Sequence, residues 1–169
     1  MSYDVQISRQ PISAVFDLKG AAAALNTWLG GSFPALPEGA NQRVTRDAVG
    51  LYHIGRQHWL LRAPIAQEEA LQSQLAPERA PSEISIVRIS DSLVFFTVTG
   101  RDTAEIMSIA CPLDLHPSAF DDSAASFTTA FGVKALVNRV SGGFEFGVDV
   151  SYADMIADYL ARASQQALA

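Results

Sequence analysis

Residues 133–163, VKALVNRVSGGFEFGVDVSYADMIADYLARA, decide the fold that the sequence predicts. An apolar run reaches a turn at 141–143, and beyond that turn apolar residues occupy every second position. These alternating positions are Phe144, Phe146, Val148 and Val150. A two-residue period is typical of a β-strand with one apolar face. The stretch therefore predicts a β-hairpin.

A helix is expected directly after this hairpin. Ser151 and Asp154 have the spacing of a capping box, which marks a helix start. The residues that follow place apolar and aromatic side chains at the spacing of one helical face. That predicted stripe consists of Tyr152, Met155, Ile156, Tyr159 and Leu160.

The same order recurs twice upstream as a weak internal repeat. VGLYHIGRQHWLLRAPIAQEEALQSQL (49–75) predicts a strand, a turn at 55–57, a second strand and a helix after Pro64. ISIVRISDSLVFFTVTGRDTAEIMSIA (84–110) predicts a strand, a turn at 90–91, a second strand and a helix after Gly100. Asp102 and Glu105 give a weaker start signal for that helix. Each unit is thus predicted to be a β-hairpin followed by a helix.

The first forty residues add shorter elements. Residues 4–20 predict one or two edge strands interrupted by Pro11, 20–31 a short helix, and 33–42 a loop. Antiparallel hairpins with packed helices predict an α+β fold. Because no long polar linker interrupts the chain, we expect a single domain over residues 1–169, in which two sheet-and-helix halves would divide near residue 80.

The composition narrows the class of protein. Of the 169 residues, 49% are hydrophobic and 18% charged, which is typical of a folded globular protein. The net charge of −6 and the scattered Lys and Arg residues argue against nucleic-acid binding. The single cysteine cannot form an internal disulfide. No apolar stretch approaches the ~20 residues of a membrane span, and MSYDVQISRQP is not a secretory signal pattern. We therefore expect a cytoplasmic protein with no nucleic-acid or membrane partner.

Residues 110–120, ACPLDLHPSAF, hold the densest set of reactive side chains. Catalysis by Cys111 would need a base and an orienting group within reach, but prolines constrain the backbone around Asp114 and His116. Cys111 also continues the helical stripe of Ile106, Met107 and Ala110, so we expect it in the core as a small hydrophobe. His116 is interpreted as a solvated loop histidine or as a contact with another chain.

A metal or cofactor site is not expected. A structural zinc site needs four nitrogen or sulfur ligands, which one cysteine with His53, His58 and His116 does not supply. His53 and His58 flank a predicted turn and are interpreted as ordinary strand histidines. Phosphate-binding and dinucleotide-binding glycine motifs are both missing from the sequence.

The remaining candidates have structural interpretations. The glycines of 29–33 are explained by a helix C-cap. The pairs Asp121–Asp122 and Glu68–Glu69 are explained by a turn and by a helix start. Trp28 and Trp59 are expected as core anchors or as interface hot spots. The residues alone therefore predict no catalytic, cofactor-binding or metal-binding residue.

The run FTVTGRDTAEIMSIACPLDLHPSAF (96–120) resembles the signature segment of the gamma subunit of heterotetrameric sarcosine oxidase. RQHWLL (56–61) and FEFGVDVSYADMIADYL (144–160) are similar to further segments of that family, in the same order. The resemblance extends over most of residues 45–163. It implies a fold like the folate-binding domain of aminomethyltransferases, built from repeated hairpin–helix units.

The resemblance also implies a function. The chain would be a non-catalytic accessory subunit that assembles with alpha, beta and delta-type subunits. The complex would oxidatively demethylate sarcosine or a related N-methyl amine to glycine, formaldehyde or methylenetetrahydrofolate, and hydrogen peroxide. FAD, FMN, NAD, zinc and folate are expected in the partner subunits and not in this chain. The alternative is a stand-alone folate-binding protein or regulator of the aminomethyltransferase type.

A surface for the partner subunits is expected near the end of the signature segment. His116 lies in extended backbone before Pro117, with apolar residues on either side of it. We therefore predict a partner contact at Leu115, His116 and Phe120.

Overall fold

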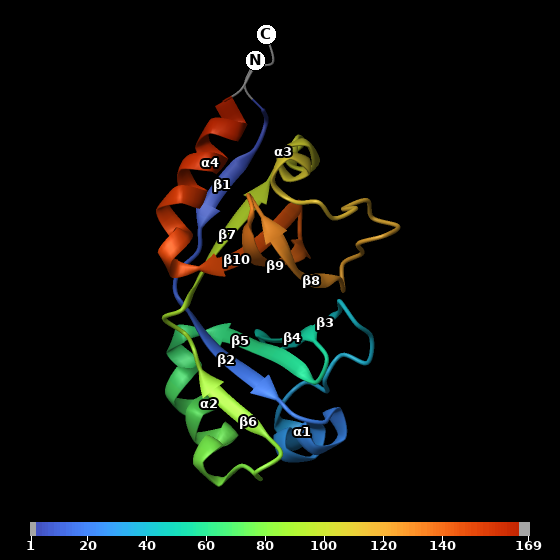
Figure 1. The fold of residues 1–169 in the computed structure, drawn as a ribbon, viewed down its shortest axis with the longest axis vertical. Coiled ribbons are helices and arrows are strands. Elements are labelled where there is room, and N and C mark those ends of the chain that lie inside the picture. The colour runs from blue at the N-terminus through green and yellow to red at the C-terminus, as the bar shows by residue number, and fades with distance from the viewer. Residues whose placement is uncertain (1–2, 166–169) are drawn as a thin grey trace. The chain divides into compact units, whose positions relative to one another are not determined.

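The computed structural model describes residues 3–165 and divides into two compact units. Ile12–Asp91 forms one, which we call the inserted unit. The chain up to Pro11 together with the chain from Ser92 onward forms the other, the split unit (Figure 1). The chain therefore passes from one unit to the other twice. That the chain acts as a single domain stays a prediction.

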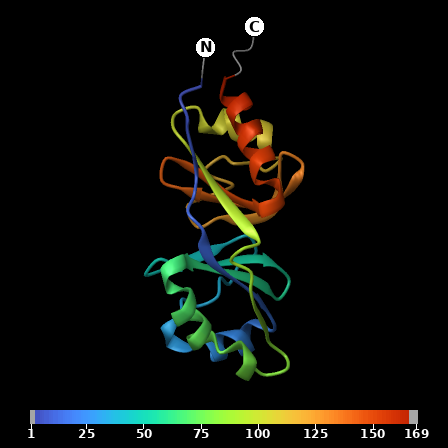
Figure 2. The ribbon, with the colours of Figure 1, turned by 90° about the vertical axis from the view of Figure 1, so that its left-hand side faces the viewer.

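The inserted unit contains a five-stranded antiparallel sheet with the strand order β3-β4-β5-β2-β6. Its strands are β2 (Ser13–Lys19), β3 (Arg43–Arg46), β4 (Val49–Gly55), β5 (His58–Pro64) and β6 (Ser85–Arg88). Its helices are α1 (Ala22–Leu29) and α2 (Glu68–Leu75). Both helices pack on the same face of the sheet (Figure 2), where they close one apolar core. Large members of this core are Phe16, Leu18, Leu25, Leu61 and Leu75.

The split unit also contains a five-stranded antiparallel sheet, in the order β1-β7-β10-β9-β8. Its strands are β1 (Gln6–Arg9), β7 (Leu93–Thr99), β8 (Ala125–Ala130), β9 (Val133–Val140) and β10 (Gly143–Asp149). Helices α3 (Thr103–Ala110) and α4 (Ala153–Gln165) pack on one face of this sheet. The core between them includes Phe96, Ile106, Met107, Phe146 and Leu160. The α+β fold expected from the sequence is confirmed.

Two of the three predicted hairpins are confirmed. β4 and β5 pair across a turn at 56–57, with a β-bulge between His53 and Gly55. β9 and β10 pair across a turn at 141–142, where Gly142 has a φ of 75°. Phe144, Phe146 and Val148 face the core as expected. Val150 does not, because β10 ends at Asp149 and Val150 lies in a 3₁₀ turn, where the residue is 46% exposed.

The second predicted hairpin is wrong. β6 and β7 are both strands, but β6 pairs with β2 in the inserted unit and β7 pairs with β1 and β10 in the split unit. Residues 89–92 are therefore a connection between sheets and not a hairpin turn. Ser90 is instead fixed against β2, because its hydroxyl oxygen accepts the N–H of Val15 at 2.9 Å. Alternating hydrophobicity predicts a strand but does not say which strand it pairs with.

The predicted start and stripe of α4 need correction. The capping box is not formed, since the Ser151 hydroxyl and N–H both donate to Oδ1 of Asp149. These hydrogen bonds stabilise the carboxylate and lower the pKa of Asp149. The buried helical face runs through Ala153, Ile156, Leu160 and Ala163, so Ile156 and Leu160 are correctly predicted. Met155 is partly buried and packs against the same core. Tyr152 lies in the 3₁₀ turn before α4 and Tyr159 on the helix itself, and both are exposed, because the buried face of α4 is narrower than the apolar pattern.

The N-terminal elements follow the expectation with one change. Pro11 separates β1 from β2. α1 ends at Leu29 and is followed by Gly30, whose φ of 61° suits a glycine C-cap. β1 is an edge strand, but β2 lies between β5 and β6. In the part of the chain that the structure describes, no helix has the length and apolarity needed to cross a membrane.

Candidate functional site

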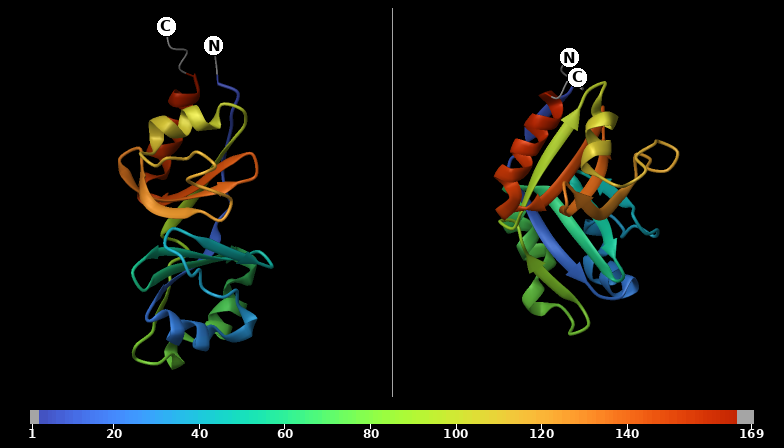
Figure 3. Two further views of the ribbon diagram at one scale, coloured as in Figure 1. Left: turned by 90° about the vertical axis from the view of Figure 1, so that its right-hand side faces the viewer. Right: turned by 45° about the horizontal axis from the view of Figure 1, so that its top comes forward.

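The split unit carries a hollow of about 530 Å³ beside the loop that follows α3. This loop, residues 111–124, joins α3 to β8 and stands out from the unit in Figures 1 and 3. The start of α3 and the β9–β10 turn complete the walls. We call this concavity the α3 hollow. Its wall includes Arg101, Ala104, Leu113, Leu115, His116, Arg139 and Phe144.

The start of α3 is fixed by polar contacts. α3 begins directly after Asp102, as predicted, but the Asp102 carboxylate does not cap the helix. Its Oδ2 accepts the N–H of Asp4 at 2.7 Å, and Asp4 in turn forms an ion pair with Arg101 at 3.2 Å. The Thr103 hydroxyl donates to the carbonyl of Gly100. The N-terminal segment thus holds one rim of the hollow in place.

The opposite rim is a loop closed by its own hydrogen bonds. Asp114 Oδ1 accepts the N–H of His116 at 3.0 Å. The carbonyl of His116 accepts the N–H groups of Ala119 and Phe120 at 2.9 and 2.8 Å. Short-range bonds of this kind give a turn a defined shape without a helix or strand. His116 is therefore held in place although its side chain is exposed.

Arg139 anchors this loop to the sheet. Its Nε donates to the carbonyl of Phe120 at 2.7 Å, and its Nη2 donates to the carbonyl of Leu115. Its guanidinium lies over the ring of Phe144, 4.7 Å from the ring centroid. The sequence interpretation missed Arg139. The signal was an arginine near the end of VKALVNRV, an otherwise mostly apolar strand.

His116 presents one ring nitrogen at the edge of the α3 hollow. Its Nδ1 receives the N–H of Ser118 at 3.2 Å and lies 2.7 Å from the Ser118 hydroxyl. A backbone N–H can only donate, so Nδ1 must accept, and the neutral ring carries its proton on Nε2. The ring therefore offers an N–H donor on the side away from Ser118.

The three residues of the predicted partner contact have different surroundings. His116 is exposed and Leu115 is half-buried, and both line the α3 hollow. Phe120 is only 5% exposed and packs against Phe144 in the core, so its side chain is not available to a partner in this structure. A contact at these residues stays a prediction.

Cys111 lies in the core, as expected from the helical stripe. It is 5% exposed and belongs to the apolar cluster of the split unit. Burial raises the pKa of the Cys111 thiol, because the thiolate loses hydration in an apolar environment. The structure therefore agrees with a structural role for this thiol.

Cys111 is expected to react slowly with iodoacetamide in the folded protein. The thiolate is the reactive species, and a raised pKa lowers its fraction at any pH below that pKa. We expect alkylation at pH 8 to be at least about tenfold slower than in urea, where the thiol regains an ordinary pKa near 8.5. Mass spectrometry of labelled samples measures both rates. Equal rates would contradict the buried position.

The two strand histidines of the inserted unit do not face each other. His58 Nε2 lies 2.6 Å from Oδ1 of Asp17. His53 Nδ1 lies 3.1 Å from the carbonyl of Gly39, and its ring stacks on Trp59 with centroids 5.4 Å apart. Across residues 3–165, no group of three His, Cys, Asp or Glu side chains is placed to hold a metal ion.

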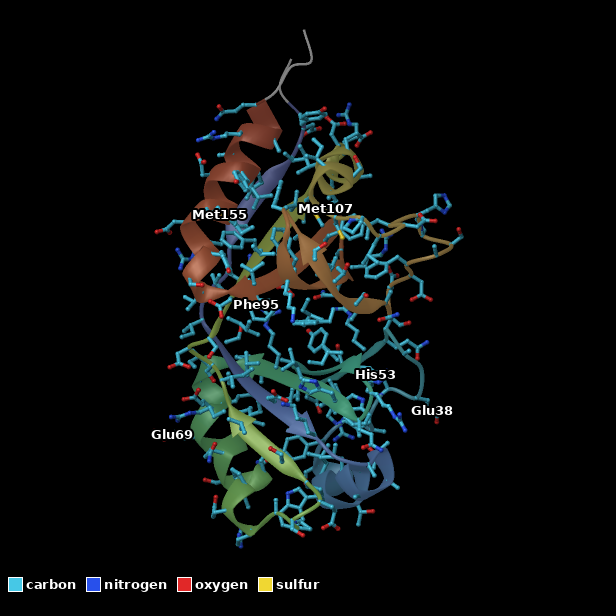
Figure 4. All side chains as sticks on the ribbon, in the orientation of Figure 1. Glu38, His53, Glu69, Phe95, Met107 and Met155 are labelled. Atoms are coloured by element: carbon cyan, nitrogen blue, oxygen red, sulfur yellow. The ribbon has the colours of Figure 1, made fainter. Side chains whose placement is uncertain are left out.

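A second hollow, of about 650 Å³, lies in the inserted unit. His53, Glu38, Asn41 and Trp59 contribute to its wall, and Figure 4 shows His53 and Glu38 on the same side of the unit. Trp59 is a core residue, as predicted. Trp28 is half-buried and packs against the same core, and its indole N–H donates to the carbonyl of Leu75 at 2.8 Å.

Asp121 and the pair Glu68–Glu69 have the structural roles predicted for them. Asp121 Oδ1 accepts the hydroxyl and the N–H of Ser123, and these bonds lower the pKa of Asp121. Glu68 and Glu69 lie in the first turn of α2, where carboxylates favour the helix dipole. Glu68 also forms an ion pair with Arg88 at 3.5 Å.

Comparisons with known proteins give structural likenesses only. No family model matches the chain, and no curated protein matches it in sequence. A chain of heterotetrameric sarcosine oxidase from Corynebacterium sp. U-96, in complex with pyrrole 2-carboxylate, has a TM-score of 0.78 and 20% identity. That match covers 98% of this chain and 88% of the other. The likeness to sarcosine oxidase expected from the sequence is confirmed at the level of fold.

Two further solved structures are similar. Glycine cleavage system aminomethyltransferase T from Bartonella henselae has a TM-score of 0.71 at 13% identity, and the match covers 94% of this chain. The chain spans 46% of the length of that protein. The regulatory subunit of aspartate kinase from Thermus thermophilus, in its ligand-free form, has a TM-score of 0.52 at 12% identity, covering 94% and 97% of the two chains. The likeness to aminomethyltransferases is therefore also confirmed as a fold.

Proposed function

We propose that this chain is a non-catalytic accessory subunit of a heterotetrameric sarcosine oxidase-type complex. The observation that carries the proposal is the extent of the likeness to a chain of the Corynebacterium enzyme, which covers 98% of this chain and 88% of that one. Because nearly the whole of both chains is matched, the likeness extends through both units and is not limited to one of them. A chain of similar size and fold in an assembled enzyme supports a role as a subunit.

The partners and chemistry of the complex belong to the same proposal. The chain would assemble with alpha, beta and delta-type subunits in the cytoplasm, with no membrane or nucleic-acid partner. The assembled enzyme would demethylate sarcosine or a related N-methyl amine. FAD, FMN, NAD, zinc and folate would be bound by the partner subunits. The accessory role is consistent with the interior position of Cys111 and with the structural roles of Asp121 and Arg139.

A stand-alone folate-binding protein is the second candidate. The likeness to the Bartonella aminomethyltransferase, with a TM-score of 0.71, favours it. However, the chain spans less than half of that protein. The ligand site of a fold need not be retained when the fold recurs in another protein. The accessory role is therefore the better-supported proposal.

Co-expression with the candidate partner subunits tests the proposal. We expect the tagged chain to co-purify with the alpha, beta and delta-type subunits encoded by its own organism, and the complex to survive size-exclusion chromatography. We also expect calorimetric titration of the isolated chain with tetrahydrofolate to give no saturable heat. The separate subunits mixed after purification serve as a control for co-folding.

The two measurements separate the two candidates. Saturable tetrahydrofolate binding by the isolated chain at micromolar ligand would favour the folate-binding protein. Failure of the chain to join the complex, whether by co-expression or by mixing, would remove the accessory role.

A further inference from the structure

We draw no further inference here: the strongest candidate, the hollow of the inserted unit between the start of α1 and the β4–β5 turn, carries nothing, because the Trp59 indole nitrogen, which has no hydrogen-bond partner among residues 3–165, is itself buried beyond the reach of a ligand, and nothing in the structure shows what occupies the hollow.

Discussion

Replacing Phe146 by alanine is expected to destabilise the split unit by about 3–5 kcal/mol. Phe146 is fully buried on β10, opposite Phe96 on β7, and their rings lie 5.9 Å apart between centroids. The substitution removes apolar contacts from both the sheet and its covering helices, and it leaves a cavity that close packing does not fill. A loss of this size is comparable with the whole stability of many small domains.

The readout must report on the split unit separately. Both tryptophans, Trp28 and Trp59, lie in the inserted unit, so their fluorescence does not follow the split unit. Hydrogen exchange of peptides from β7 and β10 gives the local free energy of opening. Phe127→Ala is a matched control, because Phe127 belongs to the same unit but is 42% exposed. We expect this control to cost about 1 kcal/mol or less, and equal losses would contradict the assigned core.

Replacing Arg139 by alanine is expected to cost about 3 kcal/mol and to release residues 112–120. The substitution removes two charge-assisted hydrogen bonds, to the carbonyls of Leu115 and Phe120, which are each worth about 1.5–3 kcal/mol. It also removes the packing of the guanidinium on Phe144. The expected loss of stability is smaller than the sum of the upper values for the two hydrogen bonds and the packing. Arg139 is only half-buried, so water can reach the two carbonyls once its side chain is removed.

Two controls make this second result specific. Arg162→Ala removes an exposed arginine whose ion pair with Asp158 is at the surface, and it is expected to cost less than about 1 kcal/mol. Arg139→Lys keeps the charge but not the planar geometry that reaches both carbonyls, so it should recover only part of the loss. Faster hydrogen exchange at 115–120 in Arg139→Ala, with unchanged exchange in β2, is the expected pattern. Unchanged exchange in the loop would show that Arg139 does not hold it.

Local patterns in the sequence predicted most of the elements. The alternation of Phe144, Phe146 and Val148 located β10, and the stripe through Ile106 and Met107 located the core face of α3 and the interior position of Cys111. These predictions succeeded because helix and strand periods depend only on residues near one another in the chain. The predicted end of β10 at Val150 and the predicted helix start at Ser151 were wrong, because a repeating pattern does not mark the residue at which a strand or helix ends.

Partner strands were not predictable in the same way. β6 and β7 follow each other in sequence with a turn-like segment between them, yet they belong to different sheets. The partner of β6 is β2, about seventy positions earlier, and the choice depends on packing that a single strand pattern does not encode. The candidate site was missed for a related reason. Arg139 reaches the carbonyls of Leu115 and Phe120 across 24 and 19 positions, and no local motif marks that contact.

The split unit consists of two chain segments separated by the whole inserted unit, and this order affects how the split unit folds while the chain is being synthesised. Strand β1 is made first, but its pairing partner β7 follows only after the whole inserted unit, and Gln10 and Thr97, which hydrogen-bond to each other, are 87 positions apart. On the ribosome, the inserted unit has all of its own strands once Asp91 has emerged. β1 must meanwhile remain unpaired, with exposed strand edges that favour aggregation until β7 and β10 arrive. Slow translation after residue 91 would lengthen this exposure, and the yield of soluble chain is therefore expected to depend on codon choice in that region.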